Sequence, residues 1–376
     1  MTFDVIIIGA GIAGSACARE CTIAGLKTAI VEAGKPGAGA TAAGMGHVVA
    51  MDDTPAHLAL TTYSRGVWQE QAITVLPRDV AYHSPGTIWI AADDEEMVEV
   101  HARLSKFEAA GIQVELLGGD ALAKVEPNLR DGLAGALFVP GDGICHPPAA
   151  AAFYLADAQQ RGAKLFLERV ISAIHGKVVL ADSTILEAPV IVLAMGVECD
   201  LLPALPIRRR KGHLVITAQR PGFLHHQLVE LGYLKSAHKT DEDTVVFNVQ
   251  PRPDGRVMIG ASRQYGSESS VIDPPVVEAL LARAHSYMPA LAEIVTESVR
   301  TGFRAATPDK LPLIGPATGL SDDPSLWLAA GFEGLGITCS PGAARLLVDN
   351  ILGRKSEIDR TPYLASRFTH LTEETA

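Results

Sequence analysis

The chain has 376 residues, of which 48% are hydrophobic and 20% are charged, and its formal net charge is −11. These proportions are typical of a globular protein with enough apolar residues to bury two cores. The negative charge and the lack of any long basic run argue against a nucleic-acid partner. No uncharged apolar run reaches about eighteen residues, so the sequence predicts no transmembrane segment.

Five cysteines are scattered along the chain, and none belongs to a C-x-x-C pair. This spacing excludes the usual iron–sulfur and zinc patterns, and we expect no bound metal. An odd number of cysteines without a disulfide framework favours a reducing compartment, so we expect a cytoplasmic protein. The N-terminus lacks a basic region and carries Asp4 before its apolar run. It therefore predicts a strand rather than a signal peptide.

The opening segment is the strongest local signal. Residues 4–8 form a β-branched apolar run that predicts a strand buried on both faces. Gly9, Gly11 and Gly14 follow as G-x-G-x-x-G, and residues 12–24 read as a helix. In this pattern the first glycine makes the turn, the second lets the backbone approach a pyrophosphate, and the third lets the helix pack closely. The helix N-terminus would face the phosphates.

A second strand, residues 26–31, ends at Glu32. Its carboxylate can accept both ribose hydroxyls of an adenosine and would repel a 2′-phosphate, which disfavours NADP. Alone, Glu32 could be a solvated strand end. The complete strand–helix–strand context favours dinucleotide binding.

Residues 33–46 form a long loop of small side chains. Such loops inside a compact domain are usually functional, and small residues would let the backbone approach the ribityl chain and ring of a cofactor. A floppy linker is the alternative. The apolar residues that resume at Val48 make it less favourable.

The middle of the chain alternates helices and strands. We expect helices at 54–75, 93–110, 122–125 and 148–162, and strands at 82–92, 114–117, 136–139, 164–174, 177–180 and 190–194. The last strand leads into Met195 and Gly196, which fits a second backbone approach to the same dinucleotide. Val170 lies on the strand that would cross near the adenine. Taken singly, each of these positions could be ordinary core.

The late part of the chain changes character twice. Residues 208–299 predict antiparallel strands at 212–217, 244–249 and 256–260 and a helix at 275–287, which suggests a substrate domain. Its histidines show no metal-ligand spacing. A strand at 326–330 then leads through a glycine-rich loop to a helix at 341–352. A helix N-terminus there could stabilise negative charge on the N1–C2=O edge of a reduced flavin.

With both ends described, the chain resembles the D-amino-acid-oxidase-like family of FAD enzymes, which includes glycine oxidase, sarcosine oxidase and the β subunits of bacterial proline and hydroxyproline dehydrogenases. The resemblance covers most of the chain and rests on the segments VIIIGAGIAG, GATAAGMG, VLAMG, TPDKLPLIGP and AAGFEGLGIT. It implies an α/β plus α+β fold, with a discontinuous Rossmann-like FAD-binding domain and an antiparallel-sheet substrate domain. The FAD-binding domain would comprise residues 1–80, 141–205 and 300–376, and the substrate domain residues 81–140 and 206–299.

The resemblance also implies residues that hold FAD. They are Gly9, Gly11, Ile12, Ala13, Gly14, Glu32, Ala33, Thr41, Ala42, Ala43, Gly44, Met45, Gly46, Val170, Ala194, Gly196, Gly331, Gly334, Leu335, Gly336, Ile337 and Thr338.

The chemistry implied by the family is hydride transfer from the substrate α-carbon to flavin N5, which gives an imine that water hydrolyses. Arg304 falls where the family's carboxylate-binding arginine lies, and its planar guanidinium can grip a carboxylate with two hydrogen bonds. A surface salt bridge is the alternative for Arg304. His47 could lie beside the flavin ring or could simply be packed. Tyr233 and Lys235 are further candidates from the substrate domain.

Four positions depart from the family pattern. Glu333 stands where glycine oxidase has an arginine, so it could meet a cationic or hydroxylated part of the substrate. Asn248 stands near a substrate-holding tyrosine. Gly302 aligns with the cysteine that anchors FAD in monomeric sarcosine oxidase, so we expect non-covalent FAD. Met258 falls near the lysine that promotes oxygen attack in sarcosine oxidase, which favours a dehydrogenase with a partner acceptor.

The GFEGLGIT tail looks most like the proline and hydroxyproline dehydrogenase branch. The sequence therefore favours oxidation of a D-proline or cis-4-hydroxy-D-proline type of substrate. The alternatives are a glycine- or sarcosine-type oxidase that produces hydrogen peroxide, and a flavoprotein subunit that passes electrons to partner chains. A plain NAD-binding module is a distant further possibility.

Overall fold

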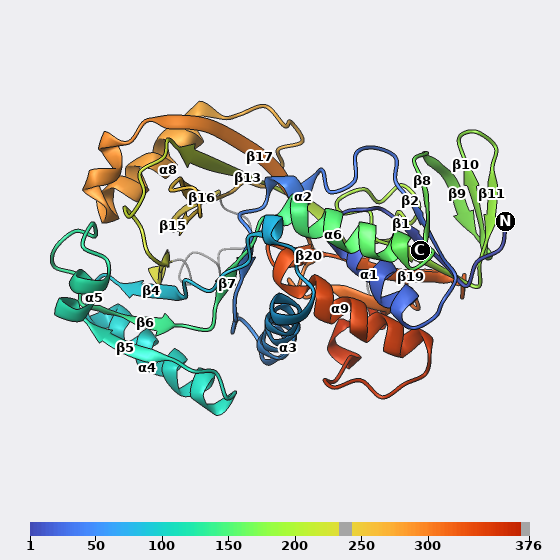
Figure 1. Cartoon of the computed structure of the whole chain (residues 1–376), viewed down its shortest axis with the longest axis horizontal. Coiled ribbons are helices and arrows are strands. Elements are labelled where there is room, and N and C mark those ends of the chain that lie inside the picture. The colour runs from blue at the N-terminus through green and yellow to red at the C-terminus, as the bar shows by residue number, and fades with distance from the viewer. Residues whose placement is uncertain (233–242, 370–376) are drawn as a thin grey trace. The chain divides into compact units, whose positions relative to one another are not determined.

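The computed structural model describes residues 1–232 and 243–369. The chain divides into two compact units (Figure 1). Unit 1 comprises Met1–Val80, Cys145–Arg209 and Arg304–Ala376, and unit 2 comprises Ala81–Ile144 and Arg210–Phe303. Among the described residues, no helix combines the length and the apolar character that a membrane crossing requires.

Unit 1 is assembled from segments that are blue, green and orange to red in Figure 1. Its helices are α1 (Ile12–Ile23), α2 (Ala40–Ala43), α3 (Pro55–Thr74), α6 (Pro147–Gln160) and α9 (Gly336–Ile351), with short 3-10 turns η1 (Arg78–Val80), η3 (Thr361–Tyr363) and η4 (Ala365–Phe368). Its strands are β1 (Val5–Ile8), β2 (Thr28–Val31), β3 (His47–Val48), β8 (Lys164–Phe166), β9 (Val170–Ile174), β10 (Lys177–Leu180), β11 (Ile185–Glu187), β12 (Val190–Leu193), β18 (Leu313–Pro316), β19 (Leu326–Ala330) and β20 (Phe332–Glu333).

The main sheet of unit 1 has the strand order β18-β19-β12-β1-β2-β8. β1 pairs in parallel with β2 on one side and with β12 on the other, and β18 alone runs antiparallel to its neighbour. From β1 the chain first builds one half of the sheet and later the other. In open α/β sheets, ligands bind outside the carboxyl ends of the strands at such a reversal, in the crevice that this topology produces.

The two faces of the β1 strand pack against different layers. Ile6 and Ile8 share a core cluster with Val178 and Leu186 of the small β9–β10–β11 sheet. Because successive strand side chains point to opposite faces, Val5 and Ile7 face the other way, toward the helical layer. All four side chains of β1 are buried. This explains why the strand reads as a continuous apolar run.

Helix α9 begins at Gly336, so the predicted start at Pro341 was wrong. Proline is favoured at the first helical position, which suggested that start, but Pro341 lies inside the helix. It cannot donate to the carbonyl oxygen of Ile337. That oxygen instead accepts from the indole Nε1 of Trp68, at 3.1 Å, and from Ser340 Oγ, at 3.2 Å. A buried side chain of α3 therefore compensates for a proline that sequence rules place at a helix start.

Other sequence predictions for unit 1 need smaller corrections. The loop at 33–46 contains the short helix α2, and the strand predicted at 164–174 is two strands, β8 and β9, which belong to different sheets. Strands β18 and β20 were not predicted. Each is short and flanked by glycine or proline, so its pattern resembles a turn.

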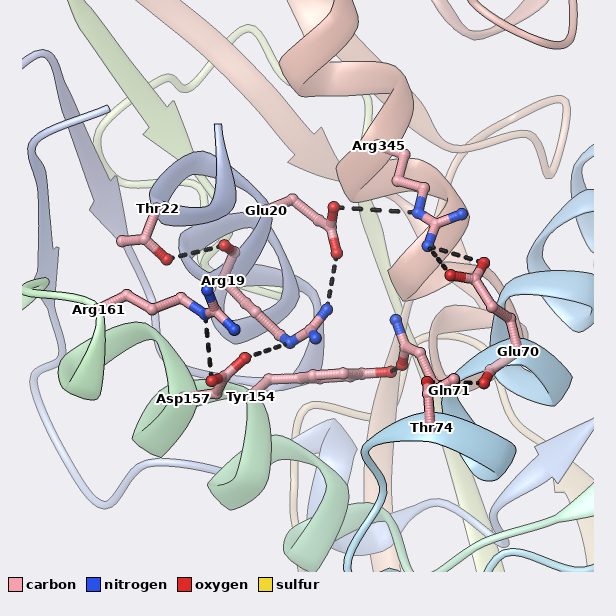
Figure 2. Close-up of polar contacts among 10 residues, drawn as sticks. All are labelled: Arg19, Glu20, Thr22, Glu70, Gln71, Thr74, Tyr154, Asp157, Arg161 and Arg345. Atoms are coloured by element: carbon pink, nitrogen blue, oxygen red, sulfur yellow. Dashed lines mark hydrogen bonds and ion pairs between the residues drawn. The ribbon is translucent and has the colours of Figure 1, made fainter. Parts of the chain in front are cut away.

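A network of ion pairs joins helices α1, α3, α6 and α9 (Figure 2). Arg19 on α1 contacts Asp157 of α6 at 2.7 Å and Glu20 at 2.9 Å. Arg345 on α9 lies between Glu20, at 3.9 Å, and Glu70 of α3, at 3.0 Å. Two helices of this network, α1 and α9, follow strands of the main sheet and begin at its carboxyl edge, where ligands are expected to bind. The network therefore fixes the far parts of the helices whose N-termini face the crevice.

Burial raises the pKa of the Glu20 carboxyl above its ordinary value of 4.5, although Arg19 and Arg345 oppose the shift. A carboxyl group with a raised pKa in the folded state binds protons more tightly there than in the unfolded chain. Its contribution to stability is therefore present below its ordinary pKa and is lost as the pH rises through the raised pKa. We expect the difference in unfolding free energy between the native protein and Glu20→Gln to become less favourable to the native protein from pH 4.5 to pH 7.

Urea unfolding of both proteins across this pH range measures that slope, with Glu278→Gln on an exposed position of α8 as the matched control. A difference that grows in favour of the native protein with pH would mean that the two arginines outweigh burial.

Unit 2 contains helices α4 (Asp94–Ala109), α5 (Gly119–Val125) and α8 (Pro274–Tyr287) and the 3-10 turn η2 (Pro289–Glu293). Its strands are β4 (Thr87–Ala91), β5 (Glu115–Gly118), β6 (Gly135–Val139), β7 (Gly143–Ile144), β13 (Arg208–Thr217), β14 (Gln227–Glu230), β15 (Thr244–Pro251), β16 (Val257–Arg263) and β17 (Thr296–Ala306). All of them except β7 belong to the large sheet, whose order is β20-β17-β13-β16-β15-β14-β4-β6-β5, with β20 paired to the last residues of β17. β17 begins in unit 2, and its last residues, from Arg304, belong to unit 1.

The sheet of unit 2 is mostly antiparallel, and the two units together confirm the expected α/β plus α+β class. One pair, β14 with β4, is parallel, and it joins the two sequence segments of the unit. Helix α8 packs on the sheet, where Tyr287 stacks on Phe247 with ring centroids 4.5 Å apart. Strands β14 and β17 were not predicted, because β14 is short and because the exposed first half of β17 lacks apolar alternation.

Candidate active site

The glycine-rich turn lies between β1 and α1, at the crevice of the unit 1 sheet. Gly9 has a φ of +107°, and a Cβ atom on it would collide with the carbonyl oxygen of Ala194 at the end of β12. A Cβ atom on Gly14 would collide with the carbonyl oxygen of Gly9. Gly14 therefore lets the first turn of α1 lie directly against the strand end, as its place in the motif predicts.

The N-terminus of α1 has the features of an anion-binding site. Its N-cap, Gly11, makes no side-chain capping bond, and no acidic residue lies in the first turn. The backbone N–H of Ile12 donates to Thr41 Oγ1 at 3.0 Å. Because this hydroxyl oxygen already accepts a hydrogen bond, its hydrogen remains oriented away and can donate to a phosphate oxygen. A positive helix end with one hydroxyl donor suits a diphosphate.

Glu32 lies at the carboxyl end of β2, beside the same turn. Its Oε2 accepts from the backbone N–H of Ala10 at 2.7 Å, and its Oε1 accepts from the N–H of Gly34 at 2.8 Å. Each carboxylate oxygen has a second lone-pair direction, so both can still accept a hydroxyl. The two backbone donors fix the carboxylate at the edge where an adenosine ribose is expected.

The small-residue loop contacts the first turn of α9. A Cβ atom on Gly44 would lie only 2.6 Å from Ile337 Cδ1, and Thr338 Oγ1 donates to the carbonyl oxygen of His47 at 2.9 Å. The same hydroxyl accepts from the N–H of Val49 at 3.3 Å. The α9 N-terminus has no acidic residue in its first turn. These contacts bring the second glycine-rich segment of the sequence next to the loop after β2.

Arg304 lies at the start of the unit 1 part of β17, where the next residue, Ala305, pairs with Glu333 of β20. The Arg304 side chain passes Gly334, since a Cβ atom built there would lie 3.7 Å from Arg304 Nε. Glu333 has a φ of +53°, and its Oε2 accepts from the N–H of Gly334 at 2.7 Å. Arg304 and the tail loop are thus adjacent, and Arg304 as a whole residue is partly buried.

Unit 1 contains every predicted FAD-contacting residue and three of the four predicted catalytic residues. The unit 1 segments before and within the first turns of α1 and α9, the end of β2 with the loop after it, and the end of β12 and β17 contain Gly9, Gly11, Ile12, Ala13, Gly14, Glu32, Ala33, Thr41, Ala42, Ala43, Gly44, Met45, Gly46, His47, Ala194, Arg304, Gly331, Glu333, Gly334, Leu335, Gly336, Ile337 and Thr338. Val170 lies on the small β9–β10–β11 sheet, and Gly196 lies on an exposed turn after β12. Asn248 belongs to β15 of unit 2. Tyr233 and Lys235 lie outside the described residues.

Trp68 was not among the residues predicted to shape the site. Its side chain is fully buried, and its indole N–H lies 3.1 Å from the carbonyl oxygens of both Ile337 and Thr338, which it holds at the start of α9. The only sequence signal was indirect, since a proline inside a helix leaves a carbonyl that needs another donor. The spacing of residues 54–75 does not identify which side chain donates to that carbonyl oxygen.

The residues present fit FAD. The glycine turn has no room for side chains, two helix N-termini lack acidic residues, and Glu32 is fixed where it can accept ribose hydroxyls. Burial, and secondarily the charge of Glu20, raises the pKa of the Cys17 thiol to about 12, which favours its protonated form. Within the described ranges, no group of three His, Cys, Asp or Glu side chains could hold a metal ion.

Comparisons with known proteins agree with this geometry. The family model described as "DAO: FAD dependent oxidoreductase" matches residues 4–350. A glycine oxidase of Pseudomonas aeruginosa is 27% identical over 386 residues, covering 96% of this chain and 98% of its own length. The crystal structure of glycine oxidase from Geobacillus kaustophilus superposes with a TM-score of 0.85 at 25% identity, covering 97% of this chain and 99% of its own. L-proline dehydrogenase from P. horikoshii has a TM-score of 0.88 at 20% identity, with 98% of both chains covered.

Proposed function

Since the chain belongs to the DAO family of FAD-dependent oxidoreductases and oxidises a small amino acid with FAD, we propose that this amino acid is glycine or an N-alkylated glycine. Two glycine oxidases match the chain over nearly its whole length. The proline dehydrogenase has the same fold at lower identity, so its similarity gives no indication of the substrate of this chain. The comparisons therefore favour the glycine-type alternative over the D-proline type that the tail segment suggested.

The observation that carries the proposal is the position of Arg304 beside the tail loop that leads into α9. The Arg304 side chain extends from a strand past Gly334, and its guanidinium can bind an α-carboxylate through two parallel N–H donors. Fixing the carboxylate fixes the α-carbon, which is the atom that reacts. In every α-amino acid the carboxylate is bonded directly to the α-carbon, so an arginine and a cofactor edge that belong to one unit suit this class of substrate.

FAD, bound non-covalently, supplies the hydride acceptor in this reaction. The chain's own contribution is to bind and orient. Thr41 and the N-terminus of α1 would hold the diphosphate, Glu32 would hold the ribose, and the uncapped N-terminus of α9 would stabilise negative charge on the ring edge. The imine product is released and hydrolyses in water.

D-proline and cis-4-hydroxy-D-proline remain the second candidates because of Glu333. A non-glycine residue with positive φ costs about 1–3 kcal/mol, and this one stands between two glycines in the tail loop. Residues with such backbone strain are concentrated at functional sites. A carboxylate in this loop could accept hydrogen bonds from the substrate nitrogen and from the ring hydroxyl of a hydroxyproline, and a glycine substrate lacks that hydroxyl.

One anaerobic experiment separates these substrates. The FAD-loaded protein is mixed with glycine, N-methylglycine, D-proline, L-proline and the hydroxyproline isomers, and bleaching of the flavin absorption is followed in time. We expect the fastest bleaching with glycine or N-methylglycine. Faster bleaching with D-proline or cis-4-hydroxy-D-proline would reverse the order of the two proposals.

Admission of air to the reduced protein then tests the electron acceptor. Rapid return of the flavin absorption with stoichiometric hydrogen peroxide identifies an oxidase. Slow return, together with fast reduction of an artificial dye, identifies a dehydrogenase that needs an electron-accepting partner subunit.

A further inference from the structure

One stripe of helix α3 carries side chains that can form hydrogen bonds although they are buried. Five such side chains are each at most 4% exposed: His57, Thr61, Ser64, Trp68 and Gln71. Their spacing of four, three, four and three residues places them on one face of the helix. Each hydrogen-bonds to a residue outside α3, as Gln71 does with Tyr154 in Figure 2. A helix that only filled the core would bury apolar side chains here, so this stripe holds neighbouring segments in place.

Two members of the stripe reach the first turn of α9. Trp68 Nε1 donates to the carbonyl oxygens of Ile337 and Thr338, both at 3.1 Å. Ser64 Oγ donates to the next carbonyl oxygen along the chain, that of Cys339, at 3.3 Å. Because both donors are buried and lie one turn apart on a helix of 20 residues, three successive carbonyl groups of α9 are held from a rigid element.

The carbonyl group of Ile337 is the one that affects a ligand at the N-terminus of α9. A trans peptide unit is planar, and its C=O and N–H point in opposite directions. The C=O of Ile337 and the N–H of Thr338 belong to one such unit. A donor that fixes the direction of this oxygen therefore also fixes the direction of the N–H, and it polarises the unit so that the N–H donates more strongly.

The N–H of Thr338 lies at the open end of α9. The first N–H groups of a helix have no intrahelical acceptor, and the N-cap residue, Leu335, makes no side-chain capping bond. The Thr338 hydroxyl is directed to another segment, since it donates to the carbonyl oxygen of His47 at 2.9 Å and accepts from the N–H of Val49 at 3.3 Å. Thr338 is therefore held by its side chain and by Trp68, while its N–H points out of the helix N-terminus.

Pro341 explains why α9 uses a donor from another helix. Proline has no N–H, so the carbonyl oxygen of Ile337, four residues earlier, cannot receive its usual helical hydrogen bond. Ser340 Oγ, at 3.2 Å, is a second donor to the same oxygen. Pro341→Ala would provide the missing N–H and would make the donation from Trp68 partly redundant.

We propose that Trp68 is a positioning residue for the flavin ring: by holding the carbonyl oxygen of Ile337, it directs the N–H of Thr338 toward the ring edge that gains negative charge on reduction. This role rests on the proposed function in that it requires FAD to lie with this edge at the N-terminus of α9. A donor that is already fixed needs no reorganisation when the charge develops. Trp68, acting through α9, would therefore favour reduced over oxidised flavin.

The test uses the FAD-loaded protein without any amino-acid substrate, and it measures the two-electron reduction potential of the flavin against a reference dye. Trp68→Phe removes the N–H and keeps an aromatic ring. We expect it to lower the equilibrium constant for reduction about fivefold, the factor that one hydrogen bond contributes, which equals about 20 mV for two electrons. A residue that only stabilised α9 would weaken the binding of oxidised and reduced FAD equally, and its loss would leave the potential unchanged.

Three further variants locate the effect. Pro341→Ala combined with Trp68→Phe should bring the equilibrium constant back to within about twofold of the native value. Trp89→Phe is the matched control, because Trp89 is buried on β4 and its Nε1 has no hydrogen-bond partner among the described residues. This control should keep the native potential. Ser340→Ala removes the other donor to the same oxygen and should shift the potential in the same direction as Trp68→Phe, by a smaller amount.

An unchanged potential in Trp68→Phe, or a double variant that does not recover, would overturn the proposal. If Trp68→Phe does not fold, Ser340→Ala carries the test, and an unchanged potential in that variant would overturn the proposal in the same way. The proposed function fails separately. A flavin that no amino acid of the panel bleaches would contradict the proposed substrates and leave the potentials standing, whereas equal potentials in an active enzyme would remove only the role of Trp68.

Discussion

Gly14→Ala is expected to abolish retention of FAD and to lower the free energy of unfolding by about 3 kcal/mol. The added methyl group would meet the carbonyl oxygen of Gly9 and would also lie 3.0 Å from its carbonyl carbon and 3.3 Å from Ala194 Cβ. These are backbone atoms and a buried alanine, which cannot move aside as a flexible side chain could. The first turn of α1 must shift away from β1, and its N–H groups then no longer face the crevice.

Two measurements check this expectation, urea unfolding and the amount of flavin released per chain on denaturation. Gly66→Ala is the matched control, because Gly66 lies in the interior of α3 with open space where a methyl group would go. That substitution should stabilise the protein by about 0.5–1 kcal/mol through the lower entropy of the unfolded chain. A Gly14→Ala protein that keeps full FAD content and native stability would contradict the placement of the dinucleotide at this turn.

Arg304→Met is expected to lower kcat/KM for the amino-acid substrate about 100- to 1,000-fold, through loss of a charged hydrogen-bonded pair. The substrate carboxylate is bound both before and during hydride loss, so most of the effect should fall on KM rather than on kcat. Arg304→Lys restores the charge but not the two-pronged geometry and should recover only part of the loss. FAD content should stay unchanged in both variants.

Steady-state kinetics with the best substrate from the anaerobic panel measure this effect. Arg300→Met, on the same strand at an exposed position, should match the native protein. If Arg304→Met left KM unchanged, another cation would have to bind the carboxylate, and the assignment of Arg304 would be withdrawn.

Much of unit 1 was predictable because its signals are local. The run at Val5–Ile8, the glycines of the turn and the acid at Glu32 lie within one strand–helix–strand segment, and each has a backbone reason to be where it is. The start of α9 was not predictable in the same way. It depends on Trp68, which lies far away in the sequence and donates to the carbonyl oxygen of Ile337, which Pro341 leaves open, and to that of Thr338. Local rules for proline could only suggest a later start.

The substrate preference was the least predictable feature. The tail segment GFEGLGIT suggested the hydroxyproline branch, whereas the similarity of the whole chain favours glycine oxidases. A short segment near a helix N-terminus is shaped mainly by the backbone it must adopt, as the positive φ angles of Gly331 and Glu333 show. Relatives that share this backbone need not share a substrate.

The pairing of β1 in the middle of its sheet has a consequence for synthesis on the ribosome. β2 emerges soon after β1, but the other edge of β1 pairs with β12, where Val5 meets Val190, and β19 joins that side only near the end of the chain. At about 5–20 residues per second, the nascent N-terminal strands must wait many seconds with one edge unsatisfied. An apolar strand with an open edge is prone to association with other chains during that interval. The half-built sheet of unit 1, more than the finished enzyme, is the form of this protein that a chaperone would most need to cover.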